Sequence, residues 1–222
     1  MYKHGDLRIA VFPDPAFQEN GMLLWLDGRP ECWIVDPGFE PQPRQLLRAV
    51  AEQRLTPVAI VLTHAHVDHI AGIAAVRQGC GAPLIVPRGE TALLADAAEN
   101  LSAFMGLPVT VAPAERTIGP GDTLWLGASS WQVLDVAGHS PGGLAYYCAE
   151  SGVALVGDAV FREGIGRTDF PHSDHARLIR NIREHLLTLP DATVLYPGHG
   201  PRATVADIRD DNQTLREALE SW

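Results

Sequence analysis

The feature that most constrains the fold of this chain is a cluster of residues with metal-ligand side chains, which directly follows an apolar, β-branched run. Residues 61–70 read VLTHAHVDHI, which places His64, His66, Asp68 and His69 within six positions. Imidazole nitrogens and carboxylate oxygens are the ligands that hold Zn, Fe or Mn in proteins. So many ionisable groups in one place are unfavourable unless a cation compensates them. The spacing therefore predicts a metal site at the end of a strand.

Three more residues of ligand type follow the ends of other apolar runs, and a glycine precedes each of them. They are His139, Asp158 and His199, preceded by Gly138, Gly157 and Gly198. Glycine permits a sharp turn or a close backbone approach to a metal. Strands that end on one edge of a sheet bring their exit loops into one cleft. We therefore expect all seven ligand-type residues to meet there.

Strand-like runs and helical periods alternate along the whole chain. The strand candidates are Leu7–Val11, Met22–Leu26, Cys32–Val35, Val58–Leu62, Pro83–Val86, Trp131–Val136, Leu144–Cys148, Val153–Val156 and Thr193–Leu195. Apolar residues at helical spacing occur in the stretches 45–50, 70–76, 93–97, 178–186 and 205–219. This interspersed order indicates an α/β fold. Because no linker or repeat interrupts it, residues 1–222 are expected to form one domain.

The composition excludes several classes of partner. The formal net charge of −10 opposes binding to a phosphate backbone, and the 17 Lys and Arg residues form no basic stripe, so nucleic acid is not expected. No apolar run approaches the roughly 18 residues of a membrane span, and the first residues are polar. We expect a soluble, cytoplasmic protein with no membrane partner. The pattern carries no signal of an oligomeric state.

With these residues in place, the chain resembles the metallo-β-lactamase superfamily. The resemblance rests on residues 63–69 and on the Gly-His and Gly-Asp pairs, which arrive in the family's order over nearly the whole chain. It implies a four-layer αββα sandwich with two metal ions in a cleft at one edge of the two sheets. It also implies which residues hold which ion, a division that spacing alone leaves open. The first ion would be held by His64, His66 and His139, the second by Asp68, His69 and His199, with Asp158 bridging both.

The segment from Gly164 to Pro171 resembles two groups within the superfamily, the glyoxalase II branch and its relatives the persulfide dioxygenases. Within the first group, the chain resembles the short hydroxyacylglutathione hydrolase-like proteins. In such proteins a basic residue at the position of Arg167 meets the anionic part of a glutathione substrate. The alternative is that Arg167 pairs with Asp169 or Glu163 as part of the scaffold. Two departures from glyoxalase II stand out. Only 23 residues follow His199, and Gly143 occupies a position where a histidine is frequent.

The resemblance implies a metal-dependent thioesterase that acts on an S-acylglutathione or a similar small thioester. A hydroxide held between two cations would attack the carbonyl, because metal binding lowers the pKa of water toward roughly 7. Asp68, besides holding the second ion, would orient that hydroxide or relay a proton. Tyr146, on the strand that follows the His139 turn, is a further candidate for substrate contact, against the alternative of an ordinary strand residue.

Three other functions stay open at this point. A persulfide dioxygenase would bind a single iron through His64, His139 and Asp158. The same metal centre could also open a β-lactam or a lactone. A nonenzymatic sensor or scaffold is disfavoured because it has no need for all seven ligand positions. Zinc is the expected metal, and iron or manganese would accept the same mixed nitrogen and oxygen set.

Overall fold

The computed structural model, which describes residues 1–220, contains two large mixed sheets and a small hairpin. The first sheet runs in chain order through β1 (Tyr2–His4), β2 (Leu7–Pro13), β3 (Asn20–Leu26), β4 (Glu31–Val35), β5 (Thr56–Val61), β6 (Leu84–Pro87) and β7 (Arg116–Ile118). The second has the order β15 (Ala203–Thr204), β14 (Val194–Pro197), β11 (Val153–Gly157), β10 (Leu144–Cys148), β9 (Ser129–Asp135) and β8 (Thr123–Leu126). The hairpin pairs β12 (Val160–Phe161) with β13 (Gly164–Ile165).

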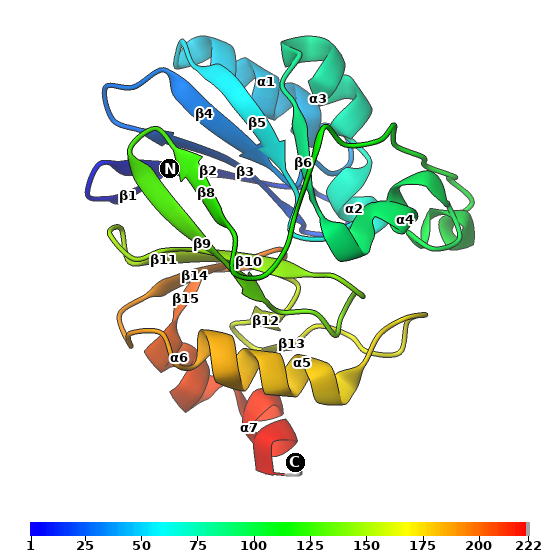
Figure 1. The fold of residues 1–222 in the computed structure, drawn as a ribbon, viewed down its shortest axis with the longest axis vertical. Helices are drawn as coiled ribbons and strands as arrows, with labels where there is room; N and C mark the ends of the chain where they lie inside the picture. The colour runs from blue at the N-terminus through cyan, green and yellow to red at the C-terminus, as the bar shows by residue number, and fades with distance from the viewer. Residues whose placement is uncertain (221–222) are drawn as a thin grey trace.

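Helices cover the outer face of each sheet. They are α1 (Gln42–Glu52), α2 (Val67–Ile70), α3 (Ile73–Cys80), α4 (Thr91–Ala95), α5 (His175–Asn181), α6 (Val205–Asp211) and α7 (Gln213–Glu220), with short 3₁₀ turns at Arg88–Glu90 and Ser102–Met105 and a π turn at Ile182–Leu186. Figure 1 shows α1 and α3 against the first sheet, and α5 and α6 against the second. This arrangement confirms the predicted αββα sandwich.

Each pair of layers encloses its own apolar core. Leu46 of α1 and Val76 of α3 pack on the first sheet, and Leu178 of α5 and Ile208 of α6 pack on the second. Because helices cover one face of each sheet and the other sheet covers the second face, β10 and β11 are buried along their whole length. The strands near the metal ligands are therefore held from both sides, which fixes the positions of their exit loops.

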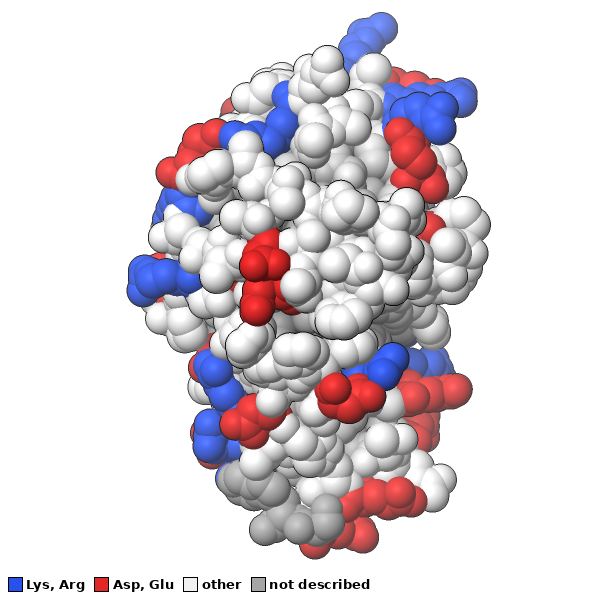
Figure 2. Space-filling view, turned by 90° about the vertical axis from the view of Figure 1, so that its right-hand side faces the viewer, with Lys and Arg blue, Asp and Glu red and all other residues white. Residues whose placement is uncertain are grey.

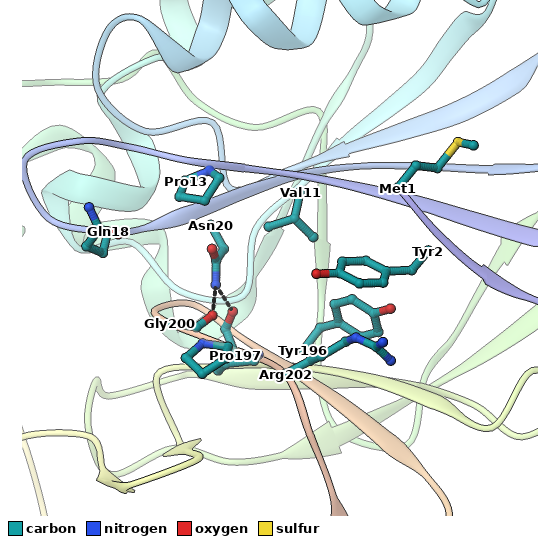
Figure 3. Close-up of a pocket in the computed structure, with 11 residues that line it drawn as sticks. Met1, Tyr2, Val11, Pro13, Gln18, Asn20, Tyr196, Pro197, Gly200 and Arg202 are labelled. Atoms are coloured by element: carbon teal, nitrogen blue, oxygen red, sulfur yellow. Dashed lines mark hydrogen bonds between the residues drawn. The ribbon is translucent and has the colours of Figure 1, made fainter.

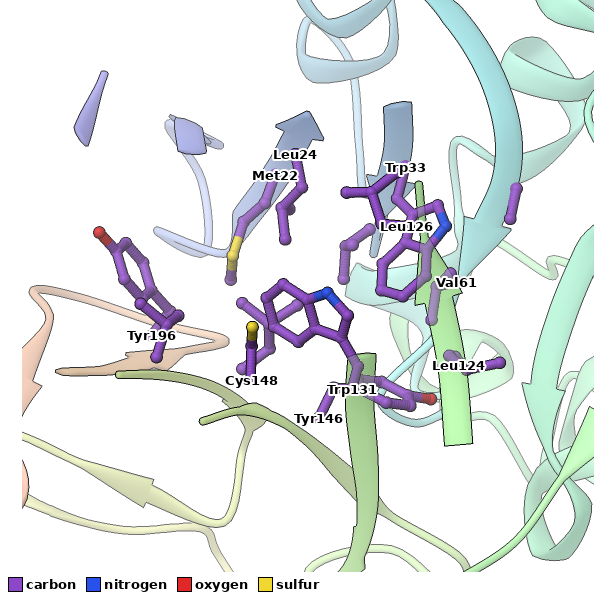
Figure 4. Packing of buried hydrophobic residues seen from close by; sticks show 14 of the residues in the cluster. Met22, Leu24, Trp33, Val61, Leu124, Leu126, Trp131, Tyr146, Cys148 and Tyr196 are labelled. Atoms are coloured by element: carbon purple, nitrogen blue, oxygen red, sulfur yellow. The ribbon is translucent and has the colours of Figure 1, made fainter. Parts of the chain in front are cut away.

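The core between the sheets also corrects one prediction. Figure 4 shows Tyr146 among the side chains that fill this space, near Trp131. Its ring is fully buried, and its hydroxyl donates a hydrogen bond to the carbonyl of Leu62. Side chains alternate along β10, so Leu144, Tyr146 and Cys148 face the first sheet. Tyr146 does not reach the cleft, and the prediction that it contacts substrate is wrong.

Two further features concern the chain as a whole. Cys32, Cys80 and Cys148 are free thiols, and the first and last of these are buried. In the described part of the chain, none of the helices combines the length and the apolar character that crossing a bilayer requires.

Candidate metal centre

The seven predicted ligands converge where four strands end. Residues 64–69 follow β5 of the first sheet, while His139, Asp158 and His199 follow β9, β11 and β14 of the second. Three clusters with ligand atoms within 4.8 Å of one another account for all seven: His64, His66 and His139; Asp68, His69 and His199; and His64, His69 and Asp158. The structure thus brings together every residue that the sequence singled out as a ligand.

The carboxylate of Asp158 lies between the first two clusters. Its Oδ2 atom is 3.5 Å from Nε2 of His139 and 3.3 Å from Nε2 of His199. Its Oδ1 atom is 3.5 Å from Nε2 of His69. On the other side, Oδ2 of Asp68 is 3.2 Å from Nε2 of His199. One carboxylate therefore faces histidines of both clusters, which is the geometry that a shared ligand requires.

Hydrogen bonds at the far side of each ring decide which nitrogen faces the centre. Nδ1 of His69 lies 3.1 Å from a carboxylate oxygen of Asp36, and Nδ1 of His139 and His199 lie 2.8 and 2.9 Å from the carbonyls of Arg167 and Phe17. These acceptors require a proton on Nδ1. They leave Nε2 of all three rings unprotonated in the neutral form, with its lone pair toward the cluster.

The ring of His64 is oriented by a longer relay. The hydroxyl of Thr63 donates its only proton to Asp36 at 2.6 Å, so it can only accept from Nδ1 of His64, 3.1 Å away. Nε2 of His64, Nε2 of His69 and Oδ1 of Asp158 are buried without a hydrogen-bond partner. Unpaired buried acceptors are costly, and a cation among them would satisfy all three. The donor set therefore fits bound metal ions.

The local electrostatics favour bound positive charge. Burial lowers the pKa of His66 to about 3 and that of His64 well below its ordinary value, so both rings stay neutral. Burial would raise the pKa of Asp158, but His69 and His199 outweigh it and hold the carboxyl ionised. The carboxylates in turn overcome burial and raise the pKa of His199 to about 10. Protons or metal ions must balance the acidic groups here.

A set of buried polar residues behind the ligands was missed by the sequence analysis. Asp36 follows β4, is fully buried, and accepts from the backbone and hydroxyl of Thr63 as well as facing His69. Glu19 is also fully buried, its Oε2 accepts a hydrogen bond from Nε2 of Gln42 at 2.7 Å, and its Oε1 lies 3.8 Å from Nδ1 of His69. The signal for Asp36 was present, because it ends a strand as the ligands do. Glu19 has no comparable signal.

Substituting Asp36 by asparagine is expected to weaken metal binding by about 10–100-fold, the usual effect of losing an outer partner. The amide of asparagine would present hydrogens to Thr63 and His69, which reverses the relay and favours protons on the Nε2 atoms that face the centre. Metal affinity is measured by competition with a chromophoric chelator. The substitution of Asp191 by asparagine, on an exposed ion pair with Arg209, is the control. Equal affinity in both variants would contradict the orienting role of Asp36.

The glycines before the ligands have the predicted function. Gly138 and Gly157 have positive φ angles of 138° and 49°, which side chains rarely tolerate. Gly198 allows a close approach, since a Cβ atom there would lie 2.1 Å from Oδ1 of Asp158. The turns that carry the ligands therefore depend on the absence of side chains.

A cavity of about 600 Å³ opens over the metal-ligand cluster. Asp68, Asp158 and three of the histidines form its floor, and Arg167 lies in its wall. The guanidinium of Arg167 binds both carboxylate oxygens of Asp169, at 2.9 and 2.7 Å, and lies over the ring of Phe170. The ion pair with Asp169 is the scaffold role that the sequence analysis gave as the alternative for Arg167. Arg167 also borders the cavity.

A second hollow, of about 360 Å³, lies beside β14 and is drawn in Figure 3. Asn20 reaches across one end of it and donates hydrogen bonds to the carbonyls of Pro197 and Gly200. None of the seven ligand residues lines this hollow in the described structure. Of these two hollows, the cavity over the ligand cluster is therefore the one that bears on the chemistry.

The family of the chain follows from this fold and site. Residues 14–199 match the Metallo-beta-lactamase superfamily, and the chain belongs to it. It is a metal-dependent hydrolase of that superfamily, related to the glyoxalase II-like members.

Several individual proteins of this superfamily are similar to the chain over most of its length. The chain is 38% identical to the probable metallo-hydrolase YqgX of Bacillus subtilis, over 91% of this chain and 95% of the relative. It is 32% identical to the hydroxyacylglutathione hydrolase GloC of Haemophilus influenzae, over 94% and 98%. Among solved structures, the B3 metallo-beta-lactamase BLEG-1 has 35% identity and a TM-score of 0.87, covering 93% of this chain and 98% of that one. TTHA1623 in a di-iron-bound form has 32% identity and a TM-score of 0.81, covering 92% and 98%.

Proposed function

We propose that this protein is a thioesterase of the glyoxalase II type, which hydrolyses an S-acylglutathione or a similar small thioester with two divalent metal ions. The observation that carries the proposal is the position of Asp158 between two three-residue ligand clusters. The similarity to the hydroxyacylglutathione hydrolase GloC supports the thioester class. The similarity to a di-iron-bound protein supports two ions and leaves zinc, iron and manganese as candidates.

The proposed ligands are divided between the two ions as the family resemblance implies. His64, His66 and His139 would hold one ion, and Asp68, His69 and His199 the other, with Asp158 shared. When bound, such ions lower the pKa of water toward roughly 7 and polarise a carbonyl. The buried ligands keep their geometry because both the sheets and the outer hydrogen bonds hold them in place, so little reorganisation is needed during the reaction.

We propose that Asp68 has a catalytic role besides its role as ligand. Its carboxylate borders the cavity and is partly exposed, whereas His69 beside it is fully buried. A carboxylate in this position can accept a hydrogen bond from the attacking water and hold its proton. It can then pass that proton to the departing thiolate, which leaves through the open side of the cavity.

The test is hydrolysis of S-lactoylglutathione and simpler thioesters by purified protein, followed by release of free thiol. We expect turnover that a chelator abolishes and that added metal restores, together with about two ions per chain by elemental analysis. The absence of chelator-sensitive turnover on every thioester would contradict the proposal. A single iron per chain with oxygen uptake on glutathione persulfide would instead indicate a dioxygenase.

Hydrolysis of a β-lactam is a second candidate, because the B3 metallo-beta-lactamase BLEG-1 shares 35% identity with this chain. A tetrahedral intermediate forms in both reactions, so a centre of this kind can act on either class of substrate. Measuring a chromogenic cephalosporin beside the thioesters ranks the two substrates by kcat/KM. We expect the thioester to be preferred.

A further inference from the structure

The cavity over the metal-ligand cluster has an apolar wall. We use the name apolar wall for its six large apolar side chains, which are Phe17, Leu101, Phe104, Met105, Phe161 and Phe170. Phe104 is 75% exposed, and Phe17 and Met105 are also exposed to solvent. A group of large apolar side chains around one hollow indicates a binding surface, whereas apolar residues that are exposed singly do not.

The apolar wall begins directly at the proposed ligands. The ring of Phe170 lies 5.5 Å from that of His66 and 5.9 Å from that of His139, and the ring of Phe161 lies 6.0 Å from that of His199. A group attached to a carbonyl at the metal centre would therefore leave it along apolar side chains.

The segment that carries Leu101, Phe104 and Met105 is held in place by buried polar groups. The side-chain amide of Asn100 donates to the carbonyls of Leu93 and Val109 at 2.9 Å, and its own backbone carbonyl accepts from the amide of Val67 at the start of α2. Leu101 itself has a φ of 72°, a left-handed conformation that is unfavourable for leucine. Strain of this kind persists where the surrounding structure enforces it, and it is frequent at ligand sites.

Among the described residues that line the cavity, no Lys or Arg side chain is free to pair with an anionic substrate. Arg167 is the single Lys or Arg among the described residues that line it, and both oxygens of Asp169 occupy its guanidinium. Figure 2 faces the side of the molecule that carries α2 and α4, where a broad area without charged side chains surrounds a small acidic patch. A glutathione conjugate carries two carboxylates, and the one described arginine of the lining is already paired with Asp169.

We infer that the apolar wall selects thioesters with an apolar group beside the scissile bond, in preference to glutathione conjugates. This inference rests on the proposed thioesterase activity and names its substrate class. Burial of each added methylene on the wall would raise the apparent affinity for the transition state by about threefold. The apolar group can belong to the acyl portion or to the thiol, and two substrate series distinguish these sources.

The first series holds the thiol constant and lengthens the acyl chain from acetyl to hexanoyl, and the second holds the acyl group constant and lengthens the thiol. We expect kcat/KM to rise by about threefold per methylene in one of them, and the longest member to exceed S-lactoylglutathione. Phe104→Ser is expected to flatten this dependence. Trp125→Ser removes an aromatic side chain that is 62% exposed and lies outside the cavity lining, and it should leave the dependence unchanged.

Non-hydrolysable thioethers separate binding from chemistry. By calorimetry, an S-hexyl thioether should bind about 200-fold more tightly than the S-methyl thioether of the same thiol, because it adds five methylenes, and Phe104→Ser should remove most of this difference. Equal rates along both series, preference for S-lactoylglutathione, or a Phe104→Ser variant with an unchanged dependence would overturn the inference while leaving the thioesterase intact. Preferential thioether binding without hydrolysis of any thioester would overturn the proposed function, and of the inference it would leave only the preference of the apolar wall for apolar ligands.

Discussion

Replacing Asp158 by asparagine is expected to lower thioester hydrolysis by about 10³-fold and to reduce the metal content from about two ions per chain to below one. Asp158 is the residue whose carboxylate lies within 3.5 Å of histidines of both ligand clusters. Asparagine has nearly the same shape, but it carries no charge and has one oxygen in place of two. Both proposed ions therefore lose the negative charge of their shared ligand in a single substitution.

A matched control distinguishes the loss of charge at Asp158 from the general effect of replacing an aspartate by asparagine. Asp191→Asn makes the same change at an exposed ion pair with Arg209, at a residue that precedes β14 whereas His199 follows it, and is expected to keep both metal and activity. Far-UV circular dichroism should be unchanged in both variants. If Asp158→Asn retained two ions and full hydrolysis, Asp158 would not be the shared ligand and the two-ion proposal would fail.

The ligand residues were predictable from the sequence because each of them follows a strand that could be recognised by its apolar run. His139, Asp158 and His199 lie far apart in the chain, and the common edge of the sheets brings them together. Asp36 obeys the same rule at the end of β4. Its neighbours Pro37 and Gly38 are typical of a turn. The sequence around Asp36 is therefore explained by a turn alone, and it does not predict that Asp36 orients His69.

The direction of Tyr146 could not be predicted, because both faces of β10 are buried. A strand with one solvent-exposed face shows alternating polar and apolar residues, and this alternation indicates which side chains point into the core. Here Tyr146 and Tyr147 face different cores, and the sequence LAYYC is apolar or aromatic throughout. Only the packing of the second sheet against the first assigns Tyr146 to the interior.

The apolar wall was also beyond prediction. Leu101, Phe104 and Met105 lie in an irregular segment with one short 3₁₀ turn, so they show no helical or strand period. Their position over the ligand cluster depends on Asn100, whose hydrogen bonds fold the segment back toward α2. Phe17 also lines the cavity, and no sequence motif marks it.

Substituting Gly198 by alanine is expected to lower hydrolysis by at least about 100-fold, to weaken metal binding, and to lower the free energy of unfolding by about 1–3 kcal/mol. A Cβ atom at this position would lie 2.1 Å from Oδ1 of Asp158 and 2.7 Å from Cε1 of His69, far inside contact distance. The backbone cannot retreat easily, because the amide of Gly198 donates to Gly157 and its carbonyl accepts from the amide of Asn20. The side chains of two proposed ligands must therefore move.

Gly200→Ala is the matched control in the same turn. Gly200 has a φ of 73°, so alanine would be strained there by about 1–2 kcal/mol, but an added Cβ atom would meet nothing within 4 Å. This variant should lose stability and keep its metal and its hydrolysis, measured by thermal unfolding, elemental analysis and thiol release. Loss of activity in both variants to the same degree would mean that the turn acts through stability alone. Loss only in Gly198→Ala would show that the close approach of the turn to Asp158 and His69 is what the reaction requires.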